Sequence, residues 1–569
     1  MGQDVWESVL PLVSGPARYA DHEWNARRRP MHQAAVRAGL LYPGTYEEGA
    51  NDYTLSVAYH TINNHPDHAA DRAFLPWPDM RRAMRERGLT LCGLESRKPL
   101  AEMQLIVVLV PSAASWVAVP ALMSLAGISP LSADRADGDP IVVAAGRGAA
   151  NPEPAAEFID AAILGDVEDA VLDICAALAD KQAAPRAARL ETIAAIPGVY
   201  VPAFYAAAPG RAPQPVHPGA PAVVEHRTAP LTEEKFPSQP IVPFVETRGE
   251  CAQVEMSRGC ACGWAGCSEH YLGGRARPRP AAEIAALALR VVNNTGYDAL
   301  SLFGADGLTP GELAAAVSEC LESLGEMRVR VYLPALRSEQ IAAIGGLGLP
   351  ALDVDVGPAS DRLRTARRLE PMDQLLASVE QAALAGTRTV RFHITVGAPG
   401  ETDEDVRETA LWIRRSSQLA REAAGPEGRL RLTTEIHAFC PQPHAPTQWF
   451  GVLPPDVLHR RLAALQEAVG RRAHLRVPPC EAVLLEALLA RGGREMSGAL
   501  HAICAHAESG LDPEACLHAL RQAGVDVQGQ ASRQLNAHDG LPWDHLQFAA
   551  SRAELAAAAQ AIGLPTCRK

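Results

Sequence analysis

Three cysteines fall within eight residues of one stretch, Gln253-Val-Glu-Met-Ser-Arg-Gly-Cys-Ala-Cys-Gly-Trp-Ala-Gly-Cys267. Residues 253–256 predict a short β-strand, so Cys260, Cys262 and Cys267 fall on the loop that follows it. Thiols grouped on such a loop are typical of a site for a soft metal ion or an iron–sulfur cluster. We therefore expect this loop to carry the chemistry of the chain.

A series of strands and helices continues from this stretch. The predicted strands are 253–256, 299–303, 328–333, 351–356, 389–396 and 431–437. Helical segments separate them, one with an apolar stripe at Ile284, Leu287 and Val291. Six strand–helix units are too few for a closed eight-unit barrel. The series predicts a partial (β/α)6 barrel with its chemistry on loops after the strands.

The residues before the barrel predict a second α/β domain. Residues 105–110, 141–145 and 161–164 are continuously apolar, which is typical of parallel strands covered on both faces. They predict a doubly wound, Rossmann-like domain. The expected divisions are this domain over 1–182, a Pro- and Ala-rich linker over 183–246, the barrel over 247–452, and a mainly helical C-terminal extension over 453–569.

Composition excludes several other classes of protein. The net charge of -13 argues against generic nucleic-acid binding, which needs a concentrated basic face. Twelve cysteines are scattered over 569 residues, and the first residues lack the pattern of a signal peptide, so a cytoplasmic location is expected. The uncharged part of the run 103–131 is long enough to span a bilayer. Pro111 and Pro120 interrupt it, so we expect a buried strand and helix and no membrane association.

Many short motifs along the chain resemble those of one family, the radical S-adenosylmethionine (SAM) proteins whose barrel follows a cobalamin-binding-like domain. The motifs with the clearest resemblance are Tyr42-Pro-Gly-Thr-Tyr-Glu47, Phe74-Leu-Pro-Trp-Pro-Asp-Met80, Asn151-Pro-Glu-Pro154, Arg258-Gly-Cys260, Asn294-Thr-Gly-Tyr297, Leu333-Pro-Ala-Leu-Arg337, Gly397-Ala-Pro-Gly-Glu-Thr-Asp-Glu-Asp405 and Pro542-Trp-Asp-His545.

The resemblance implies a specific reaction. Three cysteines in the pattern Cys-x3-Cys-x2-Cys hold a four-iron four-sulfur cluster, whose open iron binds the amino and carboxylate groups of SAM. Transfer of one electron then cleaves SAM to a 5′-deoxyadenosyl radical, which abstracts hydrogen from a substrate. An electron donor such as a flavodoxin or a ferredoxin is implied, and the substrate is unknown.

The cysteine spacing departs from the family pattern. Aligned without a gap, Cys260 and Cys267 take the first and third positions, and Trp264 takes the second. Cys262 lies two residues earlier, and Gly263 and Gly266 would allow a rearranged loop. Either Cys262 replaces the missing ligand, giving Cys260, Cys262 and Cys267 as the metal ligands, or the standard cluster is lost.

The resemblance also implies SAM-binding residues at two other strand ends. After the second strand these are Gly304, Asp306 and Gly307, with Asp306 able to receive the SAM ammonium. At the end of the strand 389–396, residues 397–401 would lie beside the adenosine, and Gly397, Pro399 and Glu401 are the candidates there. From the residues alone, this segment is equally a tight turn into a helix capped by Thr402 or Asp403.

Cobalamin stays open as a cofactor. The string Asp-x-His-x-x-Gly that supplies a lower axial ligand is absent, and residues 42–49 contain no histidine. The fold can persist without that ligand, and cobalamin can bind without a histidine.

Two other hypotheses for the cysteine loop remain. The set Cys260, Cys262, Cys267 and His270 could hold a structural zinc ion. Alternatively, the chain is a catalytically degenerate family member that acts as a scaffold or partner. Two histidines on predicted barrel strands, His393 and His437, are expected to be satisfied core groups. Five cysteines are expected to be buried small hydrophobic residues: Cys92, Cys175, Cys320, Cys504 and Cys516.

Overall fold

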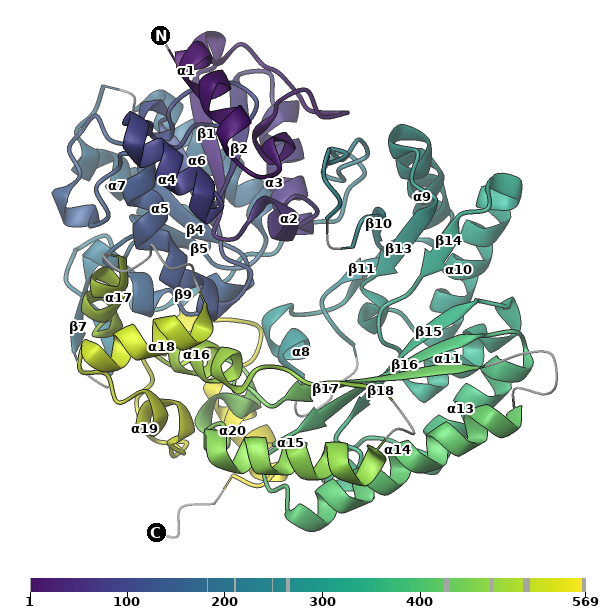
Figure 1. Ribbon diagram of the computed structural model, residues 1–569. Helices are drawn as coiled ribbons and strands as arrows, with labels where there is room; N and C mark the ends of the chain where they lie inside the picture. The colour runs from purple at the N-terminus through teal and green to yellow at the C-terminus, as the bar shows by residue number, and fades with distance from the viewer. Residues whose placement is uncertain are drawn as a thin grey trace. The chain divides into compact units, whose positions relative to one another are not determined.

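The computed structural model describes residues 2–181, 183–208, 211–247, 249–261, 267–423, 430–470, 474–504 and 512–564. They form two compact units, each assembled from more than one stretch of the chain (Figure 1). Unit 1 comprises Met1–Glu250, Leu488–Val527 and Gly540–Phe548, and unit 2 comprises Cys251–Ala487, Gln528–Asp539 and Ala549–Lys569. The residues after 487 therefore contribute to both units.

Unit 1 is built on a six-stranded sheet in the order β2-β1-β3-β4-β5-β6. All neighbouring pairs are parallel except β5 with β6. The strands are β1 (Val36–Tyr42), β2 (His68–Phe74), β3 (Leu105–Leu109), β4 (Ile141–Ala145), β5 (Ala161–Ile163) and β6 (Val199–Tyr200). The order of the first five is that of a doubly wound sheet with a switch point between β1 and β3. The Rossmann-like prediction is confirmed.

Burial explains why the sequence identified only part of this sheet. Every residue of β3 and β4 is buried and nearly all are large and apolar. β2 is equally buried but contains Asp71 and Arg72. Arg72 is accommodated because its guanidinium pairs with Glu23 and Glu95, both also buried. These partners are distant in sequence, so the apolar pattern could not reveal the strand.

Helices and short strands complete unit 1. Its α-helices are α1 (Gly2–Val9), α2 (Tyr46–Gly49), α3 (Tyr53–Asn64), α4 (Pro78–Arg87), α5 (Val119–Leu125), α6 (Val167–Asp180), α7 (Arg186–Ala194), α17 (Met496–Cys504) and α18 (Pro513–Gln522). Within residues 183–246, where the sequence predicts an extended linker, the structure forms α7, β6 and a hairpin of β7 (Tyr205–Ala208) and β8 (Arg211–Pro215). A further strand, β9 (Val224–Glu225), pairs with β19 (Leu546–Gln547).

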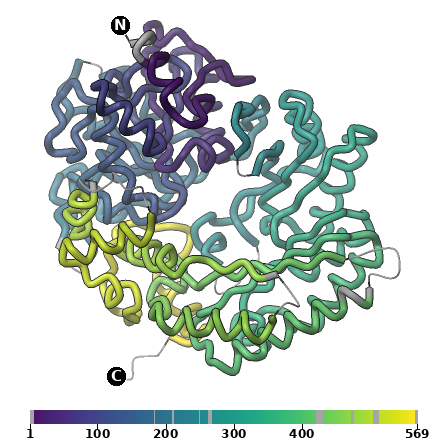
Figure 2. Tube along the Cα trace, viewed as in Figure 1, coloured from purple at the N-terminus to yellow at the C-terminus, as the bar shows by residue number. Residues whose placement is uncertain are grey.

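The C-terminal part of unit 1 packs against the loops that follow β3 and β4. Helix α17 contacts the 3-10 helices Ala113–Ala118 and Glu153–Ala155, and Figure 2 shows this yellow-green segment beside the blue part of the trace. Glu153 is fully buried, and its carboxylate accepts bonds from the Tyr200 hydroxyl (2.6 Å) and Arg494 Nε (3.0 Å). This ion pair joins residues far apart in the chain.

Unit 2 carries a series of parallel strands that follow the chain order. One sheet is β10-β13-β14 and a second is β15-β16-β17-β18. A parallel bridge between Leu336 and Val354 connects the two, so the series is continuous. The strands are β10 (Ala252–Glu255), β13 (Ala299–Phe303), β14 (Arg330–Tyr332), β15 (Ala351–Gly357), β16 (Thr389–Val396), β17 (Arg431–Ala438) and β18 (His474–Arg476). The first six match the six strands of the predicted partial barrel.

Alternating burial orients these strands. Val390, Phe392, Ile394 and Val396 of β16 are buried, whereas the residues between them are half-buried. Consecutive helices contact one another in chain order along the series. The helices of unit 2 are α8 (Ser268–Leu272), α9 (Ala281–Thr295), α10 (Pro310–Leu324), α11 (Ser338–Ile344), α12 (Asp361–Ala366), α13 (Met372–Leu384), α14 (Asp403–Ala423), α15 (Pro455–Val469) and α20 (Arg552–Ala561). The sequence boundaries between the units fall within α16 (Cys480–Ala490) and α19 (Val527–Ser532). The short strands β11 (Ser257–Arg258) and β12 (Arg277–Pro278) pair antiparallel.

Local sequence explains where two of these helices begin. Thr309 and Glu312 form a capping box at the start of α10. At α14, the backbone N–H of Thr402 donates to the Asp405 carboxylate (2.7 Å), and the Asp405 N–H lies 3.4 Å from the Thr402 hydroxyl. Thr402 is therefore the cap, one of the two residues that the sequence offered for this role.

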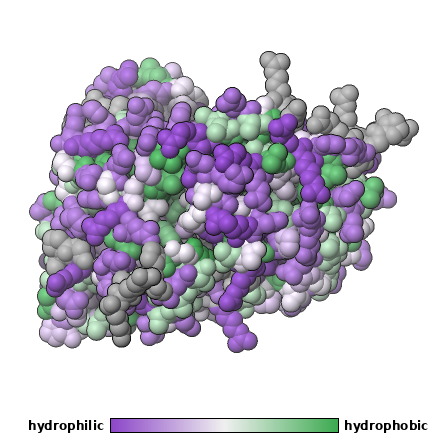
Figure 3. Space-filling model, turned by 90° about the horizontal axis from the view of Figure 1, so that it is seen from below, coloured by the Kyte–Doolittle hydropathy of each residue, from purple (hydrophilic) through white to green (hydrophobic). Residues whose placement is uncertain are grey.

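The outer surface is rich in polar groups. Figure 3 shows hydrophilic side chains over much of the viewed face, with apolar ones scattered between them. Every helix in the described part of the chain is too short or too polar to cross a membrane. The run 103–131 instead supplies the buried strand β3 and the helix α5, as the sequence predicts.

Candidate functional site

The cysteine loop begins at the end of the first barrel strands. Cys260 is 3% exposed, and its backbone N–H donates to the Gly274 carbonyl (3.3 Å). Its own carbonyl faces His270 Nδ1 at 3.2 Å. Cys267 is half-buried directly before α8. Cys262, Gly263, Trp264 and Gly266 lie outside the described residues, so the ligand role of Cys262 stays a prediction.

The loop after β13 holds the start of the cysteine loop. The N–H of Ala261 donates to the Asp306 carbonyl (3.0 Å), and the Ser257 hydroxyl donates to the Gly304 carbonyl. Gly304 has φ +82°, and a Cβ on it would lie 2.1 Å from the Ser257 carbonyl oxygen. A Cβ on Gly307 would lie 2.1 Å from the Ser257 hydroxyl. Both predicted glycines are thus required for close approach of the two loops.

Two carboxyl groups influence each other beside this contact. Asp306 is half-buried on the loop after β13, and Asp355 lies on β15. Burial, and then the negative charge of Asp306, raise the pKa of Asp355 to about 6. Because the Asp306 charge disfavours ionisation of Asp355, a cation placed near the two groups would be stabilised. Asp355 is a site residue that the sequence analysis did not identify.

The residues predicted after β16, Gly397, Pro399 and Glu401, lie in a turn that has its own hydrogen bonds and ion pair. The N–H of Gly397 donates to the Glu401 carboxylate (2.7 Å), and Arg461 of α15 pairs with the same carboxylate (3.1 Å). The Glu401 side chain is 3% exposed, and burial raises its pKa to about 7. The Pro399 carbonyl accepts a bond from Arg367 (2.8 Å). The turn is therefore held in place by Arg367, which is buried, and by Arg461, which is half-buried.

Several other thiols are unsuited to metal ligation. Burial raises the pKa of Cys175 and of Cys320 to about 12, and that of Cys92 and of Cys516 to about 11. Metal ligation requires the thiolate, which these environments disfavour. The predicted burial is confirmed for Cys175, Cys320 and Cys516, whereas Cys92 is half-buried and lines a pocket. The side chain of Cys504 lies outside the described residues.

The prediction that His393 and His437 are core groups is wrong. Alternate strand residues share a face, and both imidazoles lie on the half-exposed face of β16 and β17, where His393 Nδ1 is 2.9 Å from His437 Nε2. His393 is half-buried and His437 is exposed. On the same face Asp353 pairs with Arg391 (3.0 Å).

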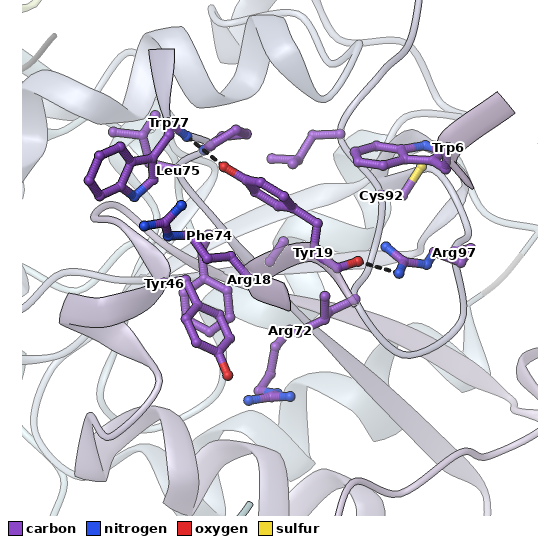
Figure 4. A pocket seen from close by; sticks show the side chains of 14 residues that line it. Trp6, Arg18, Tyr19, Tyr46, Arg72, Phe74, Leu75, Trp77, Cys92 and Arg97 are labelled. Carbon is purple, nitrogen blue, oxygen red and sulfur yellow. Dashed lines mark hydrogen bonds between the residues drawn. The ribbon is translucent and has the colours of Figure 1, made fainter. Parts of the chain in front are cut away.

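Unit 1 contains a small pocket of its own. Figure 4 shows aromatic and arginine side chains around it, among them Trp6, Tyr19, Phe74 and Trp77. The three arginines that line it are already engaged: Arg18 pairs with Glu47, Arg72 with two glutamates, and Arg97 with the Tyr19 carbonyl. The pocket is therefore better suited to an apolar or aromatic group than to an anion. Part of its wall comes from two of the motifs named in the sequence analysis, residues 42–47 and 74–80, although the sequence predicted no ligand there.

The loop after β1, residues 42–49, is the segment in which the sequence analysis looked for a cobalamin ligand. Thr45 and Glu48 form a capping box there, and the Tyr46 hydroxyl pairs with the buried Glu23. A Cβ on Gly49 would lie 2.5 Å from the Tyr42 ring. The loop is packed on its own side chains and offers no imidazole, so it does not fit a histidine-ligated cobalamin.

Comparison with known proteins identifies the family. Residues 54–202 match the family described as "Radical SAM proteins, N-terminal", and residues 254–413 match the radical SAM superfamily. The two matches take up more than half of the chain. No curated protein matches it in sequence. The chain belongs to the radical SAM superfamily.

Solved structures with a similar arrangement include two radical SAM enzymes. The radical SAM methyltransferase TsrM from Kitasatospora setae, solved with tryptophan and a SAM analogue, is 13% identical, with TM-score 0.46, 86% of this chain covered and 100% of that chain. The cobalamin-dependent enzyme OxsB, with aqua-cobalamin bound, is 11% identical, with TM-score 0.45 and coverage of 67% and 52%. The hydrogenase maturase HydG is 13% identical, with TM-score 0.28 and coverage of 41% and 54%. The family assignment comes from the two sequence matches.

Proposed function

We propose that this chain binds a four-iron four-sulfur cluster through Cys260, Cys262 and Cys267 and binds SAM beside it, for reductive cleavage to a 5′-deoxyadenosyl radical. The substrate is unknown. The observation that carries the proposal is the bonded contact between the cysteine loop and the loop after β13. Ala261 donates to Asp306, and Ser257 fills the space left by Gly304 and Gly307. These contacts hold the start of the cysteine loop next to the loop that we propose binds SAM.

The described donor set fits such a cluster. Cys260 is buried at a strand end and Cys267 is half-buried directly before α8, so a cluster between them would be shielded on the protein side. Thiolates are the usual ligands of iron–sulfur clusters. When bound, the cluster supplies the electron for SAM cleavage and a coordination position for SAM. Radical SAM proteins need a reductant, and we propose a flavodoxin or a ferredoxin in that role.

In this proposal the protein's own residues position SAM. The Asp306 carboxylate receives the SAM ammonium group. The carboxyl of Asp355 lies close enough to have its pKa raised, and a nearby cation would favour ionisation of both carboxyls. The Gly397–Glu401 turn, fixed by Arg367 and Arg461, forms the adenosine side. The barrel places these groups at strand C-terminal ends, where partial and complete barrels both carry their chemistry.

A binding measurement tests the SAM site apart from turnover. SAM affinity is measured by calorimetry on anaerobically reconstituted protein with Asp306→Asn, using Asp373→Asn as the control because Asp373 is exposed on α13. Loss of a hydrogen bond to a charged group costs about 1.5–3 kcal/mol, so the affinity should fall roughly 10- to 150-fold for Asp306→Asn only. Equal affinity of the two variants would remove Asp306 from the site.

A metal analysis tests the cluster and separates the alternatives. Anaerobic reconstitution should give about four irons and matching sulfide per chain. Cys260→Ala should lose them, whereas Cys320→Ala, a buried thiol of α10, should retain them. Zinc without iron would support the structural zinc site, to which His270 would add a nitrogen ligand. Protein without either metal would support a degenerate scaffold.

Three further parts of the proposal concern cofactor, location and organisation. Cobalamin, if it binds unit 1, would do so without a histidine from the loop after β1. A cytoplasmic location agrees with the scattered free cysteines. The division into an N-terminal domain, a linker, a barrel and a C-terminal extension at residues 182, 246 and 452 remains a proposal, with bounds that differ from those of the two compact units.

A further inference from the structure

Three potential metal ligands share one face of the barrel strands, away from the cysteine loop in sequence. In the parallel register of β16 and β17, His393 lies opposite Glu435 and Thr395 lies opposite His437. Because side chains two residues apart point to the same face, Glu435 and His437 project together beside His393. We propose that His393, Glu435 and His437 bind a divalent transition-metal ion.

The distances suit a single ion. His393 Nδ1 and His437 Nε2 are 2.9 Å apart. Two nitrogen ligands at ~2.1 Å from a metal and at right angles to each other are about 3.0 Å apart. Glu435 Oε2 lies 3.8 Å from His393 Nδ1, and one ligand atom from each of the three residues lies within 4.8 Å of the other two.

The groups around the three ligands are arranged to support this role. The other ring nitrogen of His393, Nε2, lies 3.5 Å from Asp353 Oδ2 and has no hydrogen bond in the described structure. A metal-bound histidine ordinarily donates its second ring N–H to such a carboxylate, which fixes the ring and its tautomer. Asp353 is thus a positioning residue for His393.

Glu435 divides its two oxygens between different partners. Arg476 Nη1 lies 3.0 Å and Arg391 Nε 3.4 Å from Oε1. Oε2 is the oxygen that faces His393. The arginines therefore orient the carboxylate and leave the second oxygen directed at the imidazoles. They also offset the charges of Asp353 and Glu435. A third carboxyl, that of Asp355, lies opposite His393 in the register of β15 and β16.

The donor set restricts the metal. Two imidazoles and one carboxylate suit Zn²⁺, Fe²⁺ or Co²⁺ in preference to Mg²⁺ or Ca²⁺, which favour oxygen. Since His437 is exposed, the remaining coordination positions would be open to water or to another ligand. Such a site would be chemically distinct from a thiolate site.

Cobalt titration under anaerobic conditions tests the proposal. Co²⁺ bound by nitrogen and oxygen gives visible d–d bands, whereas Co²⁺ bound by thiolate also gives strong sulfur-to-metal charge transfer. The titration is run on protein in which Cys260, Cys262 and Cys267 are replaced by Ser, so that these thiols cannot bind Co²⁺. The expected result is one Co²⁺ per chain with d–d bands and without the charge-transfer signal, displaced by Zn²⁺.

Variants then assign the ligands. His437→Ala, at an exposed position, should lower Co²⁺ affinity at least tenfold, and Glu435→Gln should do the same. Asp353→Asn should lower it about 10- to 100-fold with the d–d bands retained at saturation. His459→Ala, an exposed histidine of α15, is the matched control and should bind normally. Circular dichroism confirms that each variant is folded. Absence of Co²⁺ binding, or binding unaffected by His437→Ala, would overturn the proposal.

Discussion

Replacement of Gly304 by Ala should destabilise unit 2 far more than the same replacement at another glycine with similar backbone geometry. Gly304 has φ +82°, and Gly296, which ends α9, has φ +73°. A Cβ on Gly296 would meet nothing within 4 Å, whereas one on Gly304 would lie 2.1 Å from the Ser257 carbonyl oxygen. Comparison of Gly304→Ala with Gly296→Ala therefore separates the effect of backbone strain, which both share, from the effect of the contact with Ser257, which only Gly304 makes.

The magnitudes follow from this difference. A left-handed conformation costs a residue with a Cβ about 1–2 kcal/mol, which both variants bear. Overpacking adds roughly 1–3 kcal/mol at Gly304 only. Displacement of the loop would also break the hydrogen bond from the Ser257 hydroxyl, worth about 0.5–1.5 kcal/mol. Gly304→Ala should thus lose ~2–4 kcal/mol more than Gly296→Ala.

Urea unfolding of the metal-free variants measures this difference in the free energy of unfolding. Iron content after reconstitution measures its consequence for the cysteine loop, and it should fall in Gly304→Ala alone. Losses of stability within about 0.5 kcal/mol of each other, with equal iron content, would refute the argument that the two loops depend on close approach.

Two further predictions concern buried charges. Arg494→Met should lower the stability of unit 1 by ~3–5 kcal/mol, because it removes the arginine that pairs with the fully buried Glu153 and leaves the Tyr200 hydroxyl as its hydrogen-bond donor; thermal unfolding showing a loss below about 1 kcal/mol would contradict this. Burial raises the pKa of Glu401 from 4.5 to about 7, so the folded protein retains its proton where the unfolded chain has lost it. Stability should therefore fall by about 3 kcal/mol as pH rises from 4.5 to 7, and Glu401→Gln should abolish this slope in urea titrations. An unchanged slope would show that Arg461 keeps the carboxylate ionised.

The longer barrel strands were predictable because they show a clear pattern of alternating residues. Val390, Phe392, Ile394 and Val396 alternate with polar residues, and the predicted strand 389–396 has the bounds observed for β16. Leu105–Leu109 and Ile141–Ala145 were equally clear as uninterrupted apolar runs. In these segments, local pattern and tertiary environment agree.

Other elements depend on partners that sequence cannot reveal. β2 contains Arg72, whose charge is neutralised by Glu23 and Glu95. β9 exists as a strand through its pairing with β19, more than 300 residues later. The contributions of Asp355, Ser257 and Arg461 to the candidate site likewise arise from contacts between loops. The glycines at 304 and 307 were identified by resemblance, and the structure supplies the steric reason for them.

The central claim is that Cys262 supplies the third cluster ligand in place of the residue at position 264. Iron content and 5′-deoxyadenosine formation should be measured after anaerobic reconstitution of the natural chain, of Cys262→Ala, and of Cys262→Ala combined with Trp264→Cys, which restores the family spacing. The account predicts about four irons and product for the natural chain, loss of both in the single variant, and recovery of iron in the double variant. Full iron content and product in Cys262→Ala alone would contradict it.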